Sequence, residues 1–291
     1  MNKNSMLMSG LRKIGLDKYA FSIRRFHVPV NKDALVLEVG SGGNPYYRSN
    51  VLIDAYVDTR ERHYAKLISD RPTVLGFVEN LPFKDNSFDF VIASHVLEHS
   101  KDPVKFISEI QRVSKAGYIE VPDAFFERLT CYLDHKLEIT DIDNELIIRK
   151  KSNYIEDEEV RELFLNKFRE IFAKVSSTNP FHFTVRYYWS QETGGIKYKL
   201  KNKDYEIDWE APTTENPYRK ISKKEQLKNK LLMLARKYLS QNKRNKSINI
   251  YDLIMCVNCH KSDFVKSENK VICKNCKTEY PMINDEIIKF N

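Results

Sequence analysis

Short apolar runs alternate with amphipathic segments in the first half of the chain. The apolar runs predict four strands, at residues 35–39, 51–54, 88–93 and 118–121. One intervening segment, residues 103–113, places its apolar side chains on a single helical face. Strands that alternate with helices are typical of an α/β domain with a parallel sheet.

The pattern changes after residue 123 and becomes that of antiparallel strands with one helix. The later elements predicted are a hairpin at 135–140 and 145–150, a helix at 160–175, and strands at 181–189, 196–200 and 205–209. A further helix is predicted near the start, around residues 11–26. We divide the chain into a helical lead-in (1–33), an α/β domain (34–210), a basic helical linker (211–250) and a small C-terminal module (251–291).

The composition is that of a folded protein. Hydrophobic residues make up 42% and aromatic residues 12% of the 291 residues, which excludes a disordered chain. No apolar stretch reaches the length of about 18 residues that a membrane-spanning helix needs. The first residues lack the continuous apolar core of a signal peptide. We therefore expect a cytoplasmic protein, or one peripheral at the membrane, whose five cysteines stay reduced.

Glycines cluster where the first predicted strand ends, in the run Glu38-Val39-Gly40-Ser41-Gly42. Such a turn lets the backbone approach a ligand at the carboxyl edge of a parallel sheet. A dinucleotide site would need a third glycine where this chain has Pro45, and a helix before the strand at residue 51. The cofactor S-adenosylmethionine has no phosphate. Glu38 could offset its ammonium group, and Asp54 could accept hydrogen bonds from its ribose hydroxyls.

Further motifs follow in a fixed order. They are Leu-Pro-Phe-Lys-Asp-Asn-Ser-Phe-Asp at 81–89, Val-Leu-Glu-His at 96–99, Glu-Ile-Gln-Arg-Val at 109–113 and Gly-Tyr-Ile at 117–119. With the glycine cluster, this set resembles the class I S-adenosylmethionine-dependent methyltransferases. The resemblance implies a Rossmann-like, seven-stranded, mostly parallel sheet with helices on both faces.

The same resemblance implies a set of cofactor-binding residues. These are Glu38, Gly40, Ser41, Gly42, Asp54, Val78, Glu79, Ser94 and His95. Asp54 would bind the ribose, the backbone at Val78 and Glu79 the adenine, and Ser94 and His95 the methionine part. Phe77 stands where relatives carry an Asp for the adenine amino group, so the adenine would be stacked or held by backbone.

The acceptor of the methyl group is less clearly indicated. The Asn-Pro-Pro-Tyr signature of amino-group methylation is absent, which favours an oxygen acceptor. A hydroxyl needs a general base, for which histidine is suited. His95 and His135 are the candidate catalytic residues, and each could also be a structural residue. Asp123 could orient the acceptor or only cap the following helix. We expect a glycan, a lipid-linked sugar or another small hydroxyl acceptor, with RNA or protein methylation as the alternative.

Two Cys-x-x-Cys pairs lie in the C-terminal module, at Cys256 and Cys259 and at Cys273 and Cys276. Four thiolates at this spacing favour one structural, tetrahedral Zn²⁺. The module resembles the zinc ribbon of the small activator subunit that pairs with several methyltransferases. That resemblance implies a ribbon that packs on the catalytic domain, here fused to it.

The positive charge of the chain is concentrated in residues 219–246. Eleven Lys and Arg residues stand there against Glu225 alone, which accounts for the whole net charge of +8. Leucines on one helical face make this segment basic and amphipathic, which indicates an anionic membrane surface or a nucleic acid as partner. The other interpretation is a linker helix that packs its leucines on the α/β domain.

Overall fold

The computed structural model describes residues 1–62, 65–212 and 223–291. The chain forms two compact units, each assembled from separate stretches of sequence. The first unit contains Met1–Pro29, Ala93–Pro103 and Ala116–Thr213, and the second contains Val30–Ile92, Val104–Lys115 and Thr214–Asn291. The four-part division of the chain stays a prediction, and residues 213–222 of its linker lie outside the described residues.

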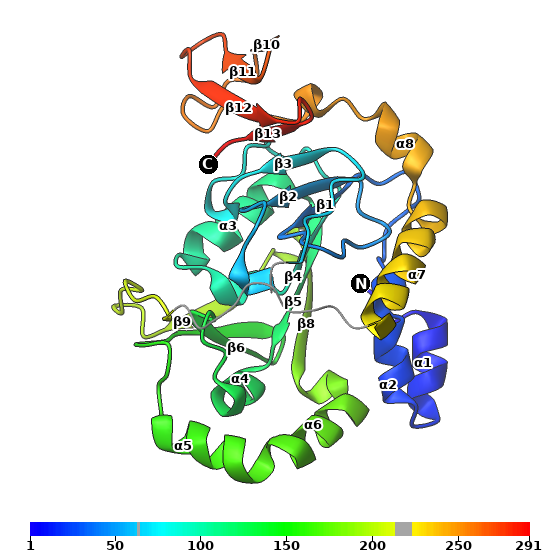
Figure 1. Cartoon of the computed structure of the whole chain (residues 1–291), viewed down its shortest axis with the longest axis vertical. Coiled ribbons are helices and arrows are strands. Elements are labelled where there is room, and N and C mark those ends of the chain that lie inside the picture. Colours follow the sequence, from blue (N-terminus) through cyan, green and yellow to red (C-terminus); the bar gives the residue numbers. More distant parts are fainter. Residues whose placement is uncertain (63–64, 213–222) are drawn as a thin grey trace. The chain divides into compact units, whose positions relative to one another are not determined.

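The second unit contains the parallel strands of the α/β sheet (Figure 1). Its strands of this kind are β1 (Val36–Val39), β2 (Val51–Asp54), β3 (Thr73–Leu75) and the first three residues of β4 (Phe90–Ser94). The order is β3-β2-β1-β4, and β2 is parallel to both β1 and β3. All residues of β1 and β2 are buried, as expected for strands covered on both faces.

The C-terminal module adds strands to the edge of this sheet. It consists of β10 (Phe264–Ser267), β11 (Lys270–Cys273), β12 (Glu279–Ile283) and β13 (Ile287–Lys289). Strand β13 is parallel to β3, with Ile288 opposite Val74, and lies beside it in Figure 1. The amide of Phe290 donates to the carbonyl of Leu75 at 2.8 Å. The module therefore covers an edge that would otherwise expose unpaired backbone groups.

The second unit also contains α-helices. They are α3 (Pro103–Val113), α7 (Lys223–Leu239) and α8 (Asn242–Ser247). Ile107, Ile110 and Val113 of α3 are buried, which confirms the predicted apolar face. Helix α8 is tied to the loop before β1, because Arg244 donates to the carbonyls of Lys32 and Ala34 at 2.8 and 2.9 Å.

The first unit is built on antiparallel pairing. Its strands are β5 (Ala116–Pro122), β6 (Leu137–Ile142), β7 (Glu145–Lys150), β8 (Thr184–Ser190) and β9 (Tyr198–Lys201). Its helices are α1 (Met6–Lys13), α2 (Asp17–Ser22), α4 (Ala124–Thr130), α5 (Glu158–Leu163) and α6 (Arg169–Thr178). Strand β5 pairs antiparallel with β8, and β6 and β7 form the predicted hairpin.

Several expectations about individual elements are wrong. The N-terminal helix is broken into α1 and α2 at Gly15, which has a left-handed φ of +75°. Residues 205–209 form no strand, because lysine side chains, rather than another strand, bond to the carbonyls of Tyr205 and Trp209. Strand β9 is parallel to β7, not antiparallel. Strand β3 was not expected, since it is only three residues long between Pro72 and Gly76.

The predicted fold class is confirmed: the parallel strands and α3 form a Rossmann-like α/β arrangement, to which a small C-terminal module is added. The predicted number of seven strands is wrong, because the described residues form a sheet of ten strands, four of which come from the C-terminal module. Among the described residues, no helix is both long and apolar enough to cross a bilayer.

Candidate functional site

The glycine turn after β1 lies directly against Asp54 at the end of β2. Gly40 and Gly42 have left-handed φ angles of +61° and +59°, which explains why glycine occupies both positions. The amide of Gly42 donates to Oδ2 of Asp54 at 2.9 Å. The two strand ends therefore form one small site at the carboxyl edge of the sheet, where ligands of such folds bind.

Arg62 also reaches this site. Its Nη1 lies 3.0 Å from Oδ1 of Asp54, and its Nε donates to the carbonyl of Ala65 at 2.8 Å. A Cβ atom on Gly42 would lie 3.4 Å from Cδ of Arg62. The arginine therefore covers the turn in this structure and partly neutralises Asp54.

Two exposed aromatic side chains stand near the end of β2 and β3. Tyr56 is 44% and Phe77 43% exposed, and their rings meet edge to face with centroids 5.8 Å apart. Phe77 precedes the short helix η3 (Val78–Asn80), which contains the predicted adenine contacts. Exposed rings suit the stacking of the adenine, which is one of the two alternatives that Phe77 leaves open.

Glu38 and Ser41 flank the turn. Oε2 of Glu38 accepts from the amide of Tyr46 at 2.8 Å and from the hydroxyl of Ser49, so Glu38 shapes the loop that follows the turn. The hydroxyl of Ser41 is buried and has no hydrogen-bond partner among the described residues. A buried hydroxyl normally has a partner. The turn, the orphaned hydroxyl and Asp54 fit a ligand rich in hydroxyl and amino groups, as S-adenosylmethionine is.

A charged cluster lies where β4 ends, in the first unit. His95 has an unusual φ of +57°, and its Nε2 and Nδ1 lie 3.5 Å and 3.3 Å from carboxylate oxygens of Glu120 and Glu98. Burial alone would lower the pKa of His95, but the nearby carboxylates of Glu120 and Glu98 raise this pKa to about 10. His95 is therefore protonated near neutral pH, and its role as a general base stays a prediction.

Glu120 is the buried centre of this cluster. It is completely buried and accepts two hydrogen bonds from Arg24, at 2.7 and 2.9 Å, and one from Ser94 at 3.1 Å. Burial by itself would raise the pKa of Glu120. The hydrogen bonds and charges of His95 and Arg24 outweigh burial and hold this pKa well below its usual value.

His135 is buried and belongs to a second group of polar side chains. Its Nδ1 lies 2.6 Å from Oε2 of Glu127, and Tyr132 stacks on its ring with centroids 4.7 Å apart. A carboxylate at Nδ1 fixes the tautomer whose Nε2 carries the lone pair. That arrangement allows Nε2 to accept a proton or to bind a cation. Asp123 accepts from the amide of Phe125 at 2.9 Å and so caps α4, as the structural alternative predicts.

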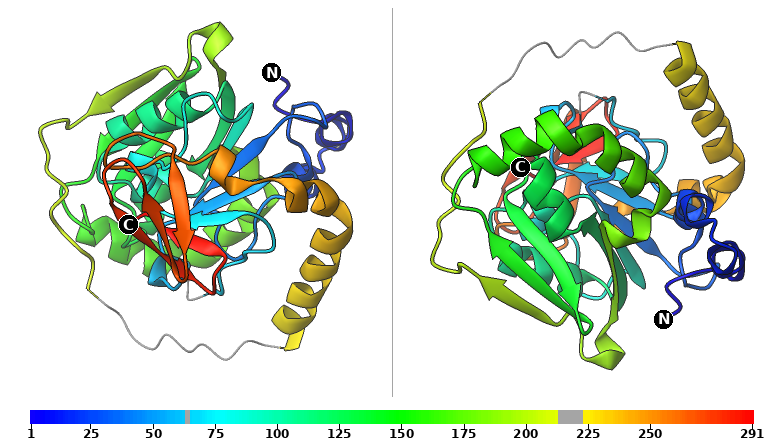
Figure 2. Two further views of the ribbon diagram at one scale, coloured as in Figure 1. Left: turned by 90° about the horizontal axis from the view of Figure 1, so that it is seen from above. Right: turned by 90° about the horizontal axis from the view of Figure 1, so that it is seen from below.

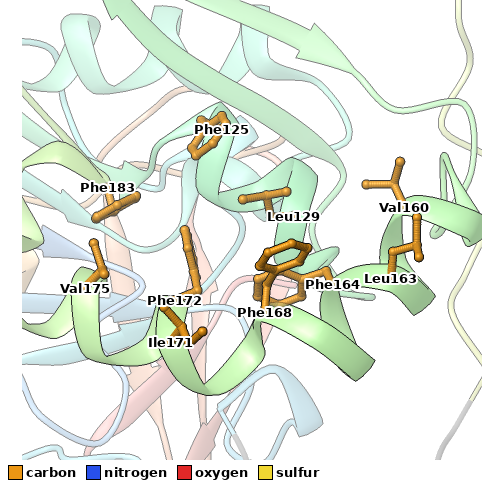
Figure 3. A pocket seen from close by; sticks show the side chains of 10 residues that line it. All are labelled: Phe125, Leu129, Val160, Leu163, Phe164, Phe168, Ile171, Phe172, Val175 and Phe183. Carbon is orange, nitrogen blue, oxygen red and sulfur yellow. The ribbon is translucent and has the colours of Figure 1, made fainter.

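An apolar pocket of about 510 Å³ lies on the other side of α4. Its lining is entirely Phe, Leu, Val and Ile: Phe125, Leu129, Val160, Leu163, Phe164, Phe168, Ile171, Phe172, Val175 and Phe183. Figure 3 shows the side chains from α4 facing those from the helical segment that runs from α5 to α6. One turn of that segment is a π-helix (Phe164–Phe168), a feature that is frequent at functional sites. Phe125 and Ile171 are 62% and 64% exposed at the rim.

The four cysteines of the C-terminal module converge as predicted. Their sulfur atoms all lie within 4.8 Å of one another. Sγ of Cys256 is 3.5 Å from Sγ of Cys276, and Sγ of Cys259 is 3.5 Å from Sγ of Cys273. These separations fit four thiolates around one Zn²⁺ at about 2.3 Å each.

Helix α7 leaves its apolar face uncovered. Leu227, Leu231, Leu234 and Tyr238 are between 53% and 76% exposed, and in both views of Figure 2 the helix projects from the strands of its unit. The interpretation that these leucines pack on the α/β domain is therefore wrong for the described residues. Part of the basic charge is used internally: Arg236 is buried and lies 3.6 Å from Asp70. Residues 219–222 of the predicted basic segment lie outside the described residues.

Sequence reasoning missed Arg62, Glu98 and Glu127. Only Glu98 had a visible signal, since it stands between His95 and His99 in a motif that the resemblance included. Glu127 lies on the short helix α4, and its burial gave no signal because acidic side chains are usually exposed.

Comparisons with known proteins agree with the resemblance. Residues 37–119 match the family model described as Methyltransferase domain. The uncharacterized protein MJ1123 of Methanocaldococcus jannaschii is 33% identical over 94 residues, which are 31% of this chain and 43% of that protein. An uncharacterized methyltransferase of Schizosaccharomyces pombe, C1B3.06c, is 49% identical over 43 residues, 15% of this chain and 16% of that protein. The chain thus spans less than half the length of these relatives.

Solved structures with a partial likeness to this chain were also found. The YcgJ protein of Bacillus subtilis has 18% identity and a TM-score of 0.31, covering 43% of this chain and 70% of that one. A complex between the Haloferax volcanii Trm112 methyltransferase activator and a methyltransferase has 16% identity and a TM-score of 0.28, covering 46% and 74%. Residues 37–119 thus match a methyltransferase domain and lie within a Rossmann-like arrangement of strands.

Proposed function

We propose that this chain transfers the methyl group of S-adenosylmethionine to a hydroxyl of a glycan, a lipid-linked sugar or another small acceptor. The observation that carries the proposal is the glycine turn closed on Asp54 within the matched domain. In the reaction, the acceptor oxygen forms a bond to the methyl carbon while the sulfur–carbon bond breaks and its electron pair stays on sulfur. The sulfonium is already activated, so the protein supplies orientation and takes up the hydroxyl proton.

Separate groups would serve the donor. Asp54 would accept from the ribose hydroxyls, and Tyr56 and Phe77 would stack on the adenine. Ribose binding at Asp54 requires Arg62 to share or release Oδ1, to which it is bonded in this structure. The glycine turn would let the donor approach the backbone closely. These assignments, with those of Glu38, Ser41, Val78, Glu79, Ser94 and His95, are part of the proposal.

Two features of the first unit support an oxygen acceptor with an apolar part. The His135–Glu127 pair resembles the oriented imidazole of a general base. The pocket beside α4 has the size typical of small-molecule sites and offers only hydrocarbon contacts. Among the expected acceptors, a lipid-linked sugar combines a hydroxyl with a hydrocarbon chain.

We further propose that Cys256, Cys259, Cys273 and Cys276 bind a structural Zn²⁺. A module of this size cannot build a sufficient core, so the metal would supply much of its folding free energy.

Asp54→Ala should weaken S-adenosylmethionine binding by about 1.5–3 kcal/mol, roughly 10- to 150-fold in Kd, since charge-assisted hydrogen bonds are lost. Isothermal titration calorimetry on the full chain measures this effect. Asp58→Ala, which removes a carboxylate from the exposed loop nearby, is the matched control and should bind as the wild type does. Equal affinity of the two variants would mean that Asp54 is misassigned, and no binding by the wild type would overturn the proposed function.

The alternative function, RNA or protein methylation, is suggested by the basic segment. The exposed leucines of α7 favour a membrane surface instead, because they bind hydrocarbon and contribute nothing to phosphate recognition. We expect the chain to sediment with vesicles that contain phosphatidylserine and not with pure phosphatidylcholine vesicles. Leu231→Glu should abolish this, whereas Val104→Glu, an exposed apolar position on α3, should not. Salt-dependent RNA binding without vesicle binding would support the alternative.

A further inference from the structure

Three potential metal ligands converge in the first unit, outside the cysteine cluster. Glu98 and His99 belong to the short helix η4 (Leu97–His99), and His135 lies just before β6. One ligand atom from each lies within 4.8 Å of the others. The rings of His99 and His135 meet edge to face with centroids 4.7 Å apart. Segments 36 residues apart in the sequence are thus brought to one point by the fold.

Both histidines are oriented through Nδ1. Nδ1 of His135 lies 2.6 Å from the carboxylate of Glu127, and Nδ1 of His99 lies 3.2 Å from the carbonyl oxygen of Asp134. An oxygen acceptor at Nδ1 fixes the tautomer and makes Nε2 the ligand atom, which is the usual outer arrangement around metal-bound histidines. Glu127 is itself held by Lys151 at 3.4 Å, so its charge is balanced within the protein.

Glu98 gives the independent indication of a ligand. Its side chain is 2% exposed, and its contact with His95 is the ion pair described next, while Oε2 has no hydrogen bond among the described residues. The nearby Nδ1 of His95 lies at an ion-pair distance of 3.3 Å from Oε1. The ion pair with His95 leaves Oε2 of this buried carboxylate without a partner. A buried polar atom normally has one, and a cation bound by Glu98 would supply it.

We propose that Glu98, His99 and His135 bind a divalent first-row transition cation, with Glu127 positioning His135. Two imidazoles and one carboxylate suit Mn²⁺, Fe²⁺, Co²⁺ or Zn²⁺, whereas Ca²⁺ and Mg²⁺ prefer oxygen ligands alone. Three protein ligands leave open positions, which is typical of a catalytic rather than a structural site.

This inference rests on the proposed function and gives His135 a different task in it. With His135 as a ligand, the bound cation would coordinate the acceptor hydroxyl and make it more acidic. The released proton would then pass to solvent water, so that His135 need not act as the base. Hydroxyl-bearing acceptors would thereby be favoured over those without a coordinating oxygen.

The test is Mn²⁺ binding to the zinc-loaded full chain, followed by the electron paramagnetic resonance signal of free Mn²⁺. Mn²⁺ is chosen because it competes poorly for a thiolate site. We expect the wild type to bind one Mn²⁺ per chain. Glu98→Gln and His99→Gln should each lower the affinity at least 10-fold, and Glu127→Gln by about 10- to 100-fold. His27→Gln, a histidine outside the cluster, should bind as the wild type does.

Co²⁺ gives a second readout that identifies the site. In the metal-free chain, the first equivalent of Co²⁺ should fill the cysteine site and give thiolate charge-transfer absorption. The second equivalent should add only absorption from d–d transitions, because its ligands are nitrogen and oxygen atoms. Thermal unfolding without metal verifies that each variant is folded. If Glu98→Gln does not fold, the wild-type titration and His99→Gln decide the question.

S-adenosylmethionine calorimetry on the same samples separates the two proposals. A wild type that binds S-adenosylmethionine but neither Mn²⁺ nor Co²⁺ beyond the cysteine site overturns the metal inference and leaves the proposed function standing. Metal binding unchanged in folded Glu98→Gln and His99→Gln also overturns it. A wild type that binds Mn²⁺ at this cluster but not S-adenosylmethionine retains the metal site and overturns the function.

Discussion

Replacing Cys273 with serine is expected to release the proposed zinc and unfold the C-terminal module. The bound metal should contribute on the order of 10 kcal/mol to folding of a module this small. The consequence should extend beyond the module, because β13 pairs with β3 and Phe290 bonds to Leu75. The loss of β13 would expose the edge of β3 to solvent. Zinc per chain, the Tm and amide exchange at residues 287–290 measure the three effects.

Cys131→Ser is the matched control for that experiment. Cys131 is a buried thiol whose Sγ donates to the carbonyl of Tyr154 at 3.2 Å, and it is not part of the cysteine cluster. This variant should keep one zinc per chain and slow exchange at residues 287–290. One zinc per chain in Cys273→Ser would contradict the four-cysteine ligand set.

Arg24→Ala is expected to destabilise the first unit by about 3–5 kcal/mol, the cost of leaving a buried charge without its partner. Glu120 has no exposed surface and accepts two hydrogen bonds from Arg24. After the substitution, Ser94 and His95 would still be near Glu120, but the two-pronged guanidinium contact would be lost. Urea unfolding followed by fluorescence gives the change in the free energy of unfolding.

Arg12→Ala provides the comparison, because Arg12 forms an ion pair at a similar distance but in solvent. Arg12 lies 2.8 Å from Asp17, with side-chain exposures of 39% and 27%. Its removal should cost no more than about 1 kcal/mol. If the two variants lose the same free energy of unfolding, the buried Arg24–Glu120 pair contributes no more to stability than the exposed Arg12–Asp17 pair.

The parallel strands and the glycine turn were predictable because their signals are local. Each buried strand is a continuous apolar run, and Gly40 and Gly42 occupy positions where φ is positive. The cysteine cluster was equally predictable, since two Cys-x-x-Cys pairs at this spacing are typical of a metal site. Strand β3 was missed because three residues are too few to show a pattern. The predicted antiparallel direction of β9 was wrong, because the direction of pairing depends on the partner strand and not on the strand's own residues.

The acceptor side of the site could not be predicted to the same extent. His135 was a candidate from its residue type alone, and nothing in the sequence connects it to Glu127 or Glu98. The leucines of α7 show a similar limit of sequence-based prediction. Their helical spacing predicted an amphipathic face, but whether that face is covered depends on what packs against it.

The sequence by itself determined the match of residues 37–119 to a methyltransferase domain, the glycine turn with Asp54 and the four-cysteine cluster. Each of these depends on residues close together in the chain, or on one motif repeated at a fixed spacing. Only the tertiary structure decided that Glu98, His99 and His135 converge, that Arg24 neutralises Glu120, and that β13 extends the sheet at β3. Those contacts join residues far apart in sequence, and their energies come from burial and charge, which exist only once the chain has folded.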